Sequence, residues 1–384
     1  MTSPPTRPAP HRDARSAATR PAPLPPEPDA VRKGRGARAN PSGRFERRQI
    51  APDPDAWSDA ARADPTPAAP RRTEFLPDPA RTALSSNQSP DIPFDASLNP
   101  YRGCEHGCAY CYARPTHEYL GYSAGLDFET RILVKHRAPE LLRRELASSR
   151  WVPQVVALSG VTDAYQPIER KLELTRRCIA VFAEFRNPIT IVTKNALVTR
   201  DLDLLRALAE AEAVSVALSV GTLDPEIQRT LEPRASSIGE RLRAIETLAR
   251  AGIPTSAMLG PVIPGLTDHE IPAILEAAKS AGATHASYIV LRLPHGLAAL
   301  FDDWLRTYQP LRREKVLHRL EHLRGGRLND PRFGHRMRGE GRFAEQIEAT
   351  FRIWTRRLGL DGPRPALSTA AFRRPGGAQL ELSL

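Results

Sequence analysis

Three of the four cysteines in the chain lie close together, at Cys104, Cys108 and Cys111. Thiolates are soft ligands that favour iron-sulfur clusters or zinc. A [4Fe-4S] cluster normally takes four protein ligands, so three thiolates on one loop would leave one iron open for a substrate or cofactor. The alternative is a small zinc loop that His106 or His117 completes.

The fourth cysteine, Cys178, falls within a helical pattern over residues 172–185. A free cysteine in such a helix is more often a small core hydrophobe than a ligand. The few cysteines, three of them clustered, fit a reducing compartment. No apolar run reaches the roughly 20 residues of a membrane span, and no signal-peptide pattern precedes the first domain. We therefore expect a cytoplasmic protein that does not enter a membrane.

The elements that must position these cysteines form a regular alternation along the chain. Strand-like apolar runs occupy residues 155–158, 189–193, 214–220, 255–259 and 285–291. Helical patterns occupy residues 138–149, 173–185, 202–211, 238–251 and 270–281. This alternation predicts an α/β fold with parallel strands and right-handed helical crossovers. With an extended segment before the cysteines, it gives about six βα units.

A C-x3-C-x-aromatic-C loop, with Tyr110 as its aromatic residue, that opens a βα series resembles the radical S-adenosylmethionine (SAM) superfamily. The resemblance implies a partial (β/α)6 TIM-like barrel, a [4Fe-4S] cluster and SAM as cofactors. In that family the reduced cluster passes one electron to SAM, which yields a 5′-deoxyadenosyl radical that abstracts hydrogen. An electron donor such as flavodoxin or ferredoxin would then be a partner.

In a parallel α/β barrel the functional residues gather at the carboxyl ends of the strands. The family places SAM contacts after the second strand, where Gly160 and Asp163 stand in this sequence. Lys194 and Ser219, which end the third and fourth strands, are similar to positions that bind SAM in spore photoproduct lyase, a DNA-repair branch of the superfamily. The predicted cofactor-binding residues are Tyr110, Gly160, Asp163, Lys194, Ser219, Gly260 and Ile263, the last two from a segment that looks like the adenine-contact motif. For several of these the alternative is an ordinary βα turn.

The comparison with that lyase breaks down at the hydrogen donor. The lyase carries a cysteine near the end of its second strand, whereas no cysteine occurs here between Cys111 and Cys178. If a hydrogen atom must be donated, Tyr165 or Tyr288 is the available phenol, and these two are the candidate catalytic residues. The sequence resembles a bacterial branch related to the lyase, and spore photoproduct cleavage itself is not predicted.

The chain divides into four regions by composition. Residues 1–88 are rich in Pro, Ala and Arg and are predicted to be disordered. Within them, residues 32–48 form a basic run that either binds nucleic acid or docks on its own barrel. Residues 89–300 would form the radical SAM barrel, residues 301–362 a basic helical extension, and residues 363–384 a flexible tail.

The helical extension concentrates positive charge. Helices are predicted at residues 297–305, 311–324 and 345–358, with a glycine-rich loop over residues 325–342. Residues 312–374 contain 16 basic and seven acidic side chains, and 49 of the 55 basic residues in the chain are Arg. Arginine pairs well with phosphate, so DNA is a candidate partner. A solvated helical face that covers the barrel is the alternative.

The last residues of the chain follow a Pro-Gly-Gly linker and read Gln-Leu-x-Leu-x-Leu. This peptide resembles those by which bacterial DNA polymerases and repair proteins dock into the sliding clamp. Leu380, Leu382 and Leu384 would be the hydrophobic anchors and Gln379 a hydrogen-bonding group. The alternative is a tail strand that pairs with its own domain.

Three hypotheses about function follow. The first is a radical SAM enzyme that acts on DNA or damaged nucleobases. The second is a radical SAM enzyme on a small-molecule or protein substrate, with the basic surface incidental. The third is a non-catalytic, metal-stabilised nucleic-acid-binding protein. Salt-dependent DNA binding separates the first from the second, and SAM turnover separates both from the third.

Overall fold

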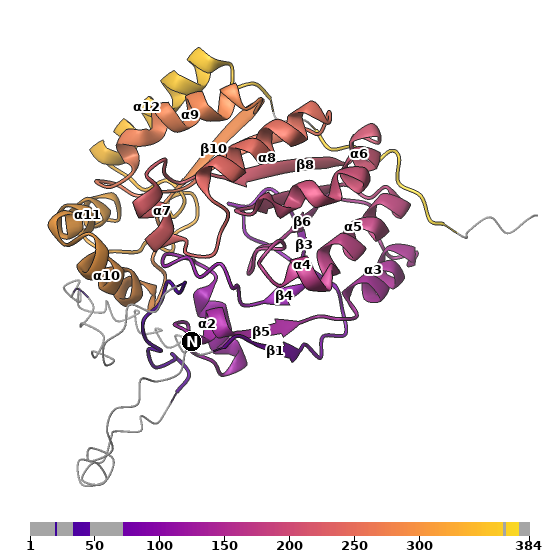
Figure 1. The fold of residues 1–384 in the computed structure, drawn as a ribbon, viewed down its shortest axis with the longest axis horizontal. Coiled ribbons are helices and arrows are strands. Elements are labelled where there is room, and N and C mark those ends of the chain that lie inside the picture. Colours follow the sequence, from indigo (N-terminus) through magenta and orange to yellow (C-terminus); the bar gives the residue numbers. More distant parts are fainter. Residues whose placement is uncertain (1–19, 21–33, 47–71, 364–365, 376–384) are drawn as a thin grey trace, which may run out of the picture.

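A computed structural model describes residues 20, 34–46, 72–363 and 366–375 (Figure 1). Its centre is a seven-stranded sheet in the order β10-β9-β8-β7-β6-β3-β2, parallel throughout except for the β2–β3 pair. The strands are β2 (Leu84–Ser86), β3 (Ala96–Leu98), β6 (Val156–Leu158), β7 (Ile189–Thr193), β8 (Val214–Ser219), β9 (Thr255–Val262) and β10 (His285–Val290). The six strands β3 and β6 to β10 neighbour one another in chain order, which confirms the predicted series of βα units of a partial barrel.

Crossover helices join consecutive strands and pack on the outside of the sheet (Figure 1). They are α3 (Ala138–Ala147), α4 (Glu169–Leu172), α5 (Leu174–Phe185), α6 (Leu202–Glu210), α7 (Pro225–Leu231), α8 (Ile238–Arg250) and α9 (Ile271–Ser280). Apolar side chains such as Leu142, Phe182 and Leu275 are buried between helices and strands, and this burial is the main favourable term in folding. Cys178 is fully buried in the same core, which confirms its predicted role as a core side chain. No helix among the described residues is both long and apolar enough to cross a membrane.

Several helix ends follow signals in the sequence. At the start of α8, the Ser237 hydroxyl accepts from the Glu240 amide while the Glu240 carboxylate accepts from the Ser237 amide, which is a capping box. Two of the helices stop before glycines with left-handed backbones, Gly252 at φ +74° and Gly282 at φ +95°. Such a backbone favours glycine, so the predicted helix stops at these two positions are confirmed.

The prediction of disorder over residues 1–88 is wrong for two described segments. β1 (Glu74–Pro77) pairs with β5 (Arg131–Val134), and β5 pairs with β4 (Tyr101–Arg102) to give a second sheet in the order β1-β5-β4. Strand β2 pairs with β3, and residues 34–46 pack on the domain with Ala37 and Ala39 buried. These short segments are ordered by partners far away in the chain, which local composition does not reveal. Apart from residue 20, the remainder of the predicted arm lies outside the described residues.

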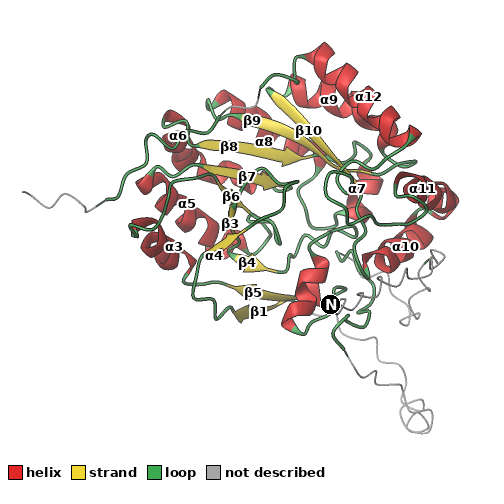
Figure 2. Cartoon of the chain, turned by 180° about the vertical axis from the view of Figure 1, so that it is seen from behind, coloured by secondary structure: helices red, strands yellow, loops and turns green. Residues whose placement is uncertain are grey.

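The C-terminal extension contains the three predicted helices, α10 (Leu297–Tyr308), α11 (Pro310–Leu323) and α12 (Arg342–Leu358). Helix α12 lies along α9, and α10 packs against α11, as Figure 2 shows from behind. Residues 324–341 form turns without helix or strand, which confirms the predicted loop. The proposed clamp-binding peptide, residues 379–384, lies outside the described residues.

Candidate active site

The loop that carries the three cysteines is turned inward. Cys104 and Cys108 expose only 6% and 7% of their surface, and Cys111 is half-buried. Gly103 and Gly107 adopt φ angles of +85° and +67°, which side chains with a Cβ rarely tolerate. The two glycines therefore allow the chain to turn tightly around the first two cysteines.

This loop packs over the carboxyl-terminal edge of the central sheet. Cys108 and Tyr110 share one hydrophobic cluster with Ile263, which directly follows β9. The amide of Ala109 donates to the carbonyl of Leu231 at 2.9 Å, at the end of α7. The predicted residues Tyr110 and Ile263 thus lie together beside the cysteines.

Burial raises the pKa of all three thiols above the ordinary value. At Cys108 the Glu232 carboxylate adds to this rise, whereas the positive charges of Lys194 and Arg241 oppose it. Metal ligation requires thiolates, and a cationic metal centre would offset the cost of ionising buried thiols. Three soft donors on one loop, two of them buried and one half-buried, therefore fit an iron-sulfur cluster.

The two histidines that could complete a zinc site differ in how far their ring nitrogens are engaged. His106 Nδ1 lies 3.4 Å from the Asp163 carboxylate, and its Nε2 lies 3.2 Å from the side-chain amide of Asn195. His117 Nε2 lies 2.9 Å from the carbonyl of Arg131. Over the described ranges, no three His, Cys, Asp or Glu side chains are grouped to hold a single metal ion. Both ring nitrogens of His106 are therefore engaged, whereas Nδ1 of His117 has no hydrogen-bond partner among the described residues, so these contacts weigh against zinc only for His106.

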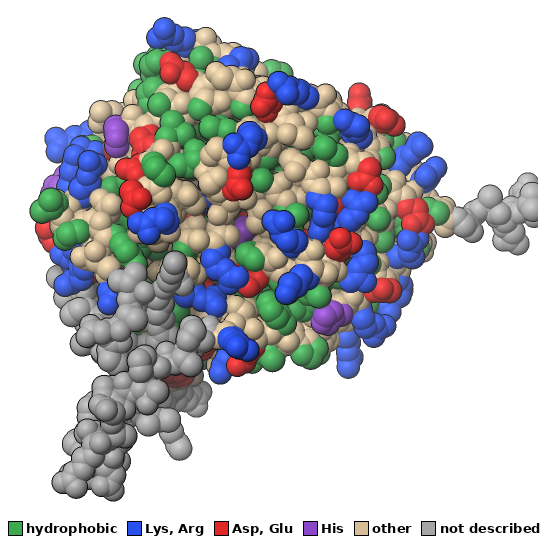
Figure 3. Space-filling view, viewed as in Figure 1, with side chains coloured by type: hydrophobic (Ala, Val, Ile, Leu, Met, Phe, Trp, Pro, Cys, Tyr) green, Lys and Arg blue, Asp and Glu red, His purple; other side chains and the backbone are tan. Residues whose placement is uncertain are grey.

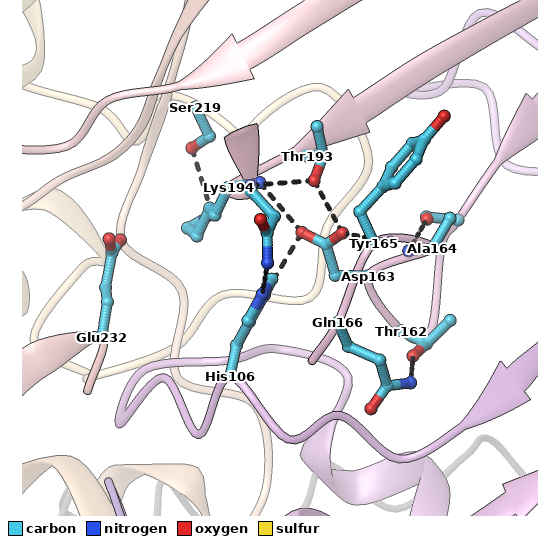
Figure 4. Close-up of polar contacts among 12 residues, drawn as sticks. His106, Thr162, Asp163, Ala164, Tyr165, Gln166, Thr193, Lys194, Ser219 and Glu232 are labelled. Carbon is cyan, nitrogen blue, oxygen red and sulfur yellow. Dashed lines mark hydrogen bonds and ion pairs between the residues drawn. The ribbon is translucent and has the colours of Figure 1, made fainter. Parts of the chain in front are cut away.

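Lys194, Ser219 and Gly260 meet at the ends of three neighbouring strands. The Lys194 ammonium donates to the Ser219 hydroxyl at 3.0 Å (Figure 4). That hydroxyl donates to the Gly260 carbonyl at 3.0 Å. The same ammonium lies 5.7 Å from the centre of the Tyr110 ring. The structure therefore brings four of the predicted cofactor-binding residues together beside the cysteine loop. We call Lys194, Ser219 and Gly260 the rim chain.

Asp163 supports this edge through a dense set of hydrogen bonds. Its carboxylate accepts from the Thr193 hydroxyl at 2.7 Å and from the Lys194 amide at 2.9 Å (Figure 4). Burial alone would raise the pKa of Asp163, but nearby His106 and these hydrogen bonds outweigh burial and lower it to about 2. Asp163 is thus an ionised carboxylate that ties the turn after β6 to the end of β7.

The predicted residue Gly160 lies in that turn, beside the cysteines. Its carbonyl accepts from the Tyr112 hydroxyl at 2.9 Å, and Tyr112 directly follows Cys111. The preceding Ser159 has a left-handed backbone with φ +84°, which a non-glycine residue rarely adopts. The turn is therefore held in an unusual conformation next to the third cysteine.

Sequence patterns gave no sign of Glu232, which the structure places behind Tyr110. Glu232 is 2% exposed and accepts from the Tyr110 hydroxyl and from the Arg241 guanidinium. Burial would raise the pKa of Glu232, but the charges of Arg241 and Lys194 and the hydrogen bonds from Tyr110 and Arg241 together outweigh burial and lower it. Arg241 also donates to the carbonyl of Ser219 at 2.9 Å. This buried ion pair joins the cysteine loop to the rim chain. It forms because Glu232, at the end of α7, lies beside Arg241 on α8, and no local sequence pattern encodes that proximity.

The two candidate catalytic tyrosines are not brought to this edge. Tyr165 is fully buried in the core, its hydroxyl donates to Asp201 at 3.1 Å, and its ring points away from Lys194 (Figure 4). Tyr288 is 3% exposed and is covered by Arg338, whose guanidinium lies 3.6 Å from the ring centre. Neither phenol faces the space beside the cysteines, so their catalytic role gains no support from this geometry.

Residues 98–278 match the model of the Radical SAM superfamily. This span contains the three cysteines, the rim chain and the Glu232–Arg241 pair. The chain therefore carries a domain of the radical SAM superfamily, which confirms the resemblance inferred from the cysteine loop.

Relatives of known sequence share part of the chain. An uncharacterized protein of Mycobacterium tuberculosis is 38% identical over 221 residues, which cover 57% of this chain and 65% of that protein. The radical SAM Nalpha-GlyT isomerase of Pseudomonas phage M6 is 30% identical over 189 residues, or 48% of this chain and 37% of that protein. The chain thus spans just under two thirds of the length of the mycobacterial relative.

Among solved structures, spore photoproduct lyase complexed with dinucleoside spore photoproduct has a similar fold. The match covers 74% of this chain and 79% of the lyase, with a TM-score of 0.54 and 16% identity. A mutant of that lyase with bound AdoMet and the same dinucleoside matches with a TM-score of 0.50 and 15% identity. At this level of identity the likeness shows that the fold is shared.

Proposed function

We propose that this protein is a radical SAM enzyme that acts on nucleic acid. It would hold a [4Fe-4S] cluster through Cys104, Cys108 and Cys111 and would bind SAM at the rim chain. The observation that carries this proposal is the convergence of the buried cysteine loop with the rim chain at one edge of the parallel sheet.

Each residue of the rim chain has chemistry suited to part of SAM. The Lys194 ammonium and the Ser219 hydroxyl can donate to a carboxylate, and a charge-assisted bond of this kind is strong. Gly260 has no side chain, and a Cβ there would lie 3.3 Å from Met258 and 3.6 Å from the Ser219 hydroxyl. These distances show a closely packed glycine, and a flat base could approach its backbone without meeting a side chain of residue 260. When bound and reduced, the cluster would supply one electron for cleavage of SAM to a 5′-deoxyadenosyl radical.

Nucleic acid is the proposed substrate class for two reasons. The lyase with the same fold was solved with a dinucleoside bound, and the chain carries a formal net charge of +11. Positive charge favours a polyanionic partner. A damaged or modified nucleobase would suit hydrogen abstraction, because a radical can act on a C–H bond that no acid or base in the site could reach.

The test is anaerobic turnover of SAM by the reconstituted full-length protein. Iron, sulfide, SAM and dithionite are supplied, and 5′-deoxyadenosine is quantified by chromatography for the wild type and for Cys108→Ala. We expect the wild type to form 5′-deoxyadenosine and Cys108→Ala to form none, with a loss of bound iron. Loss of a ligand to an otherwise three-cysteine site removes the cluster, so the effect should be complete.

Cys178→Ala is the matched control, because Cys178 is equally buried but lies in the core on α5. It should keep both iron and SAM turnover. A wild-type protein that binds iron but forms no 5′-deoxyadenosine would sink the catalytic proposal in favour of a metal-stabilised binding protein. Stimulation of turnover by DNA oligonucleotides, and not by peptides, would support the proposed substrate class.

A further inference from the structure

Residues 34–46, which we call the docked arm, pack directly on the segment that carries the cysteines (Figure 1). The arm was open to two interpretations from sequence, a nucleic-acid-binding strand or a segment docked on its own barrel. Gly36, Ala37 and Ala39 are buried. A segment whose backbone is buried against its own domain is not free to wrap a nucleic acid.

The arginines of the docked arm are used within the molecule. Arg35 donates to the carbonyl of Glu129 at 2.9 Å, and Arg38 donates to the Thr307 hydroxyl on α10 at 2.6 Å. Arg44 pairs with the Glu118 carboxylate at 2.5 Å. The positive charge that suggested a phosphate partner therefore anchors the arm across the cysteine segment and α10.

A buried carboxylate connects the docked arm to the cysteine loop. Glu129 is fully buried, and its carboxylate accepts from the amides of Gly36 at 3.1 Å and Ala37 at 2.7 Å. The same carboxylate accepts from Arg114 at 2.5 Å. Arg114, also fully buried, donates onward to the carbonyls of Cys108 at 2.9 Å and Gly107 at 3.2 Å. One continuous series of hydrogen bonds thus runs from the docked arm through the Glu129 carboxylate and the Arg114 guanidinium to the backbone of the cysteine loop.

Two backbone contacts leave no room for a side chain between arm and domain. A Cβ on Gly36 would lie 1.6 Å from the carbonyl oxygen of Gly107, on the cysteine loop. A Cβ on Gly125 would lie 2.0 Å from the carbonyl oxygen of Ala39. The Asn40 side chain adds a reciprocal pair with Asp127, at 2.9 Å in each direction. The arm is therefore fitted to this surface at backbone level.

We propose that the docked arm is a positioning element of the cluster site, and that Glu129 is the positioning residue through which it acts. The arm fixes the carbonyls of Gly107 and Cys108 through Glu129 and Arg114, and so sets the direction of the thiols. This rests on the proposed function, because the thiols are taken as cluster ligands. Partners that orient metal ligands from behind typically change metal affinity by about 10-fold to 100-fold.

The first test compares Gly36→Ala with Gly43→Ala in the reconstituted full-length protein. A Cβ on Gly36 meets backbone at 1.6 Å, whereas one on Gly43 meets only side chains, that of Glu46 at 3.4 Å and that of Glu118 at 3.9 Å. We expect Gly36→Ala to release iron to a chelator about 10-fold faster than wild type and to alter the electron paramagnetic resonance spectrum of the reduced cluster. Gly43→Ala should match wild type in both measurements. A folded Gly36→Ala with wild-type iron release and spectrum would overturn the proposal.

Glu129→Gln is the second variant, in case Gly36→Ala does not fold. It keeps the size of the side chain but removes the charge between Arg114 and the two arm amides. We expect a changed spectrum of the reduced cluster. A variant that only made the fold less stable would change thermal unfolding but not this spectrum. An unchanged spectrum together with unchanged iron release would count against Glu129 as the positioning residue.

Alkylation of cysteines in the iron-free protein separates this proposal from the proposed function. Mass spectrometry gives the rate for each thiol, with the core residue Cys178 as internal reference. In Gly36→Ala and Glu129→Gln, Cys104, Cys108 and Cys111 should react several-fold faster than in wild type, with Cys178 unchanged. If wild type forms no Cys108-dependent cluster, the proposed function fails, yet faster alkylation still shows that the arm orders the loop. Equal rates in all proteins reject the arm's role whether or not a cluster forms.

Discussion

Charged side chains are used differently at the rim of the sheet and in the C-terminal extension. In the extension, Arg332 pairs with Asp330 at 2.7 Å and with Glu340 at 3.2 Å, and Arg336 pairs with Asp91. At the rim, Lys194 donates to the neutral hydroxyl of Ser219, and among the described residues it forms no ion pair with a carboxylate. The extension has far more charge, and several of its arginines are held in ion pairs, whereas the single cation of the rim lies at the end of a strand with no ion pair in the described part of the chain.

This difference shows why net charge alone is a poor guide to a binding site. Many of the basic side chains between positions 312 and 374 make contacts within the molecule. Figure 3 shows acidic side chains among the basic ones on one face. Arg324 is one example, since it is 3% exposed and donates to the carbonyls of Leu291 and His335. A cation without a carboxylate partner, at the edge where the strands end, is the stronger sign of a ligand.

The largest effect should come from the ion pair that supports the rim. Glu232→Ala leaves the Arg241 guanidinium buried without a carboxylate, and breaking a buried pair in this way costs about 3–5 kcal/mol. Glu226→Ala, at the start of α7, removes an exposed partner of Arg229 and should cost less than about 1 kcal/mol. Urea unfolding of both variants measures the difference. Equal losses would show that the buried pair contributes no more than an exposed one.

Lys194 should matter for SAM rather than for folding. Lys194→Met keeps the length of the side chain but removes the ammonium, and loss of a hydrogen bond to a charged group costs about 1.5–3 kcal/mol. We therefore expect SAM affinity, measured by equilibrium dialysis on the reconstituted protein, to fall about 10-fold or more. Lys279→Met, on the exposed face of α9, is the control and should bind SAM as wild type does. Wild-type affinity in Lys194→Met would remove the rim chain from the proposed site.

The smallest effects should come from single arginines of the extension. Arg312 and Arg352 are exposed, and no side-chain ion pair or hydrogen bond of theirs is seen among the described residues. A plot of log affinity against log salt falls with rising salt. If the extension contacts DNA, Arg312→Gln and Arg352→Gln should each make this slope less steep by about one. Arg332→Gln should reduce the steepness less, because the charge of Arg332 already faces two carboxylates. Fluorescence anisotropy at several salt concentrations tests this, and a slope near zero in the wild type would argue for a substrate other than nucleic acid.

Much of the barrel could be predicted because its signals are local. The apolar runs that became β7 and β8, and the amphipathic patterns that became α5 and α8, were located to within a few residues. The cysteine spacing and the polar residues at strand ends were found for the same reason. In a parallel sheet the carboxyl ends share one edge, so position along the chain already predicts proximity in space.

The predictions that failed all concern residues whose partners are distant in the chain. Strand β1 has four residues and no periodic pattern, and it becomes ordered only because β5 pairs with it. Tyr165 follows a strand end, as a site residue should, but its side chain turns into the core toward Asp201. Which way a side chain points after a turn depends on the turn's backbone, and spacing does not give it.

The sequence by itself determined the group of three cysteines, the six βα units and the polar residues of the rim, because each depends on residue type and local periodicity. Only the tertiary structure decided that Glu232 and Arg241 stand behind Tyr110, and that residues 34–46 lie on the cysteine loop through Glu129 and Arg114. Buried charges must find opposite charges wherever folding brings them. Those partners come from segments far apart in the chain, so the contacts exist only once the fold has formed.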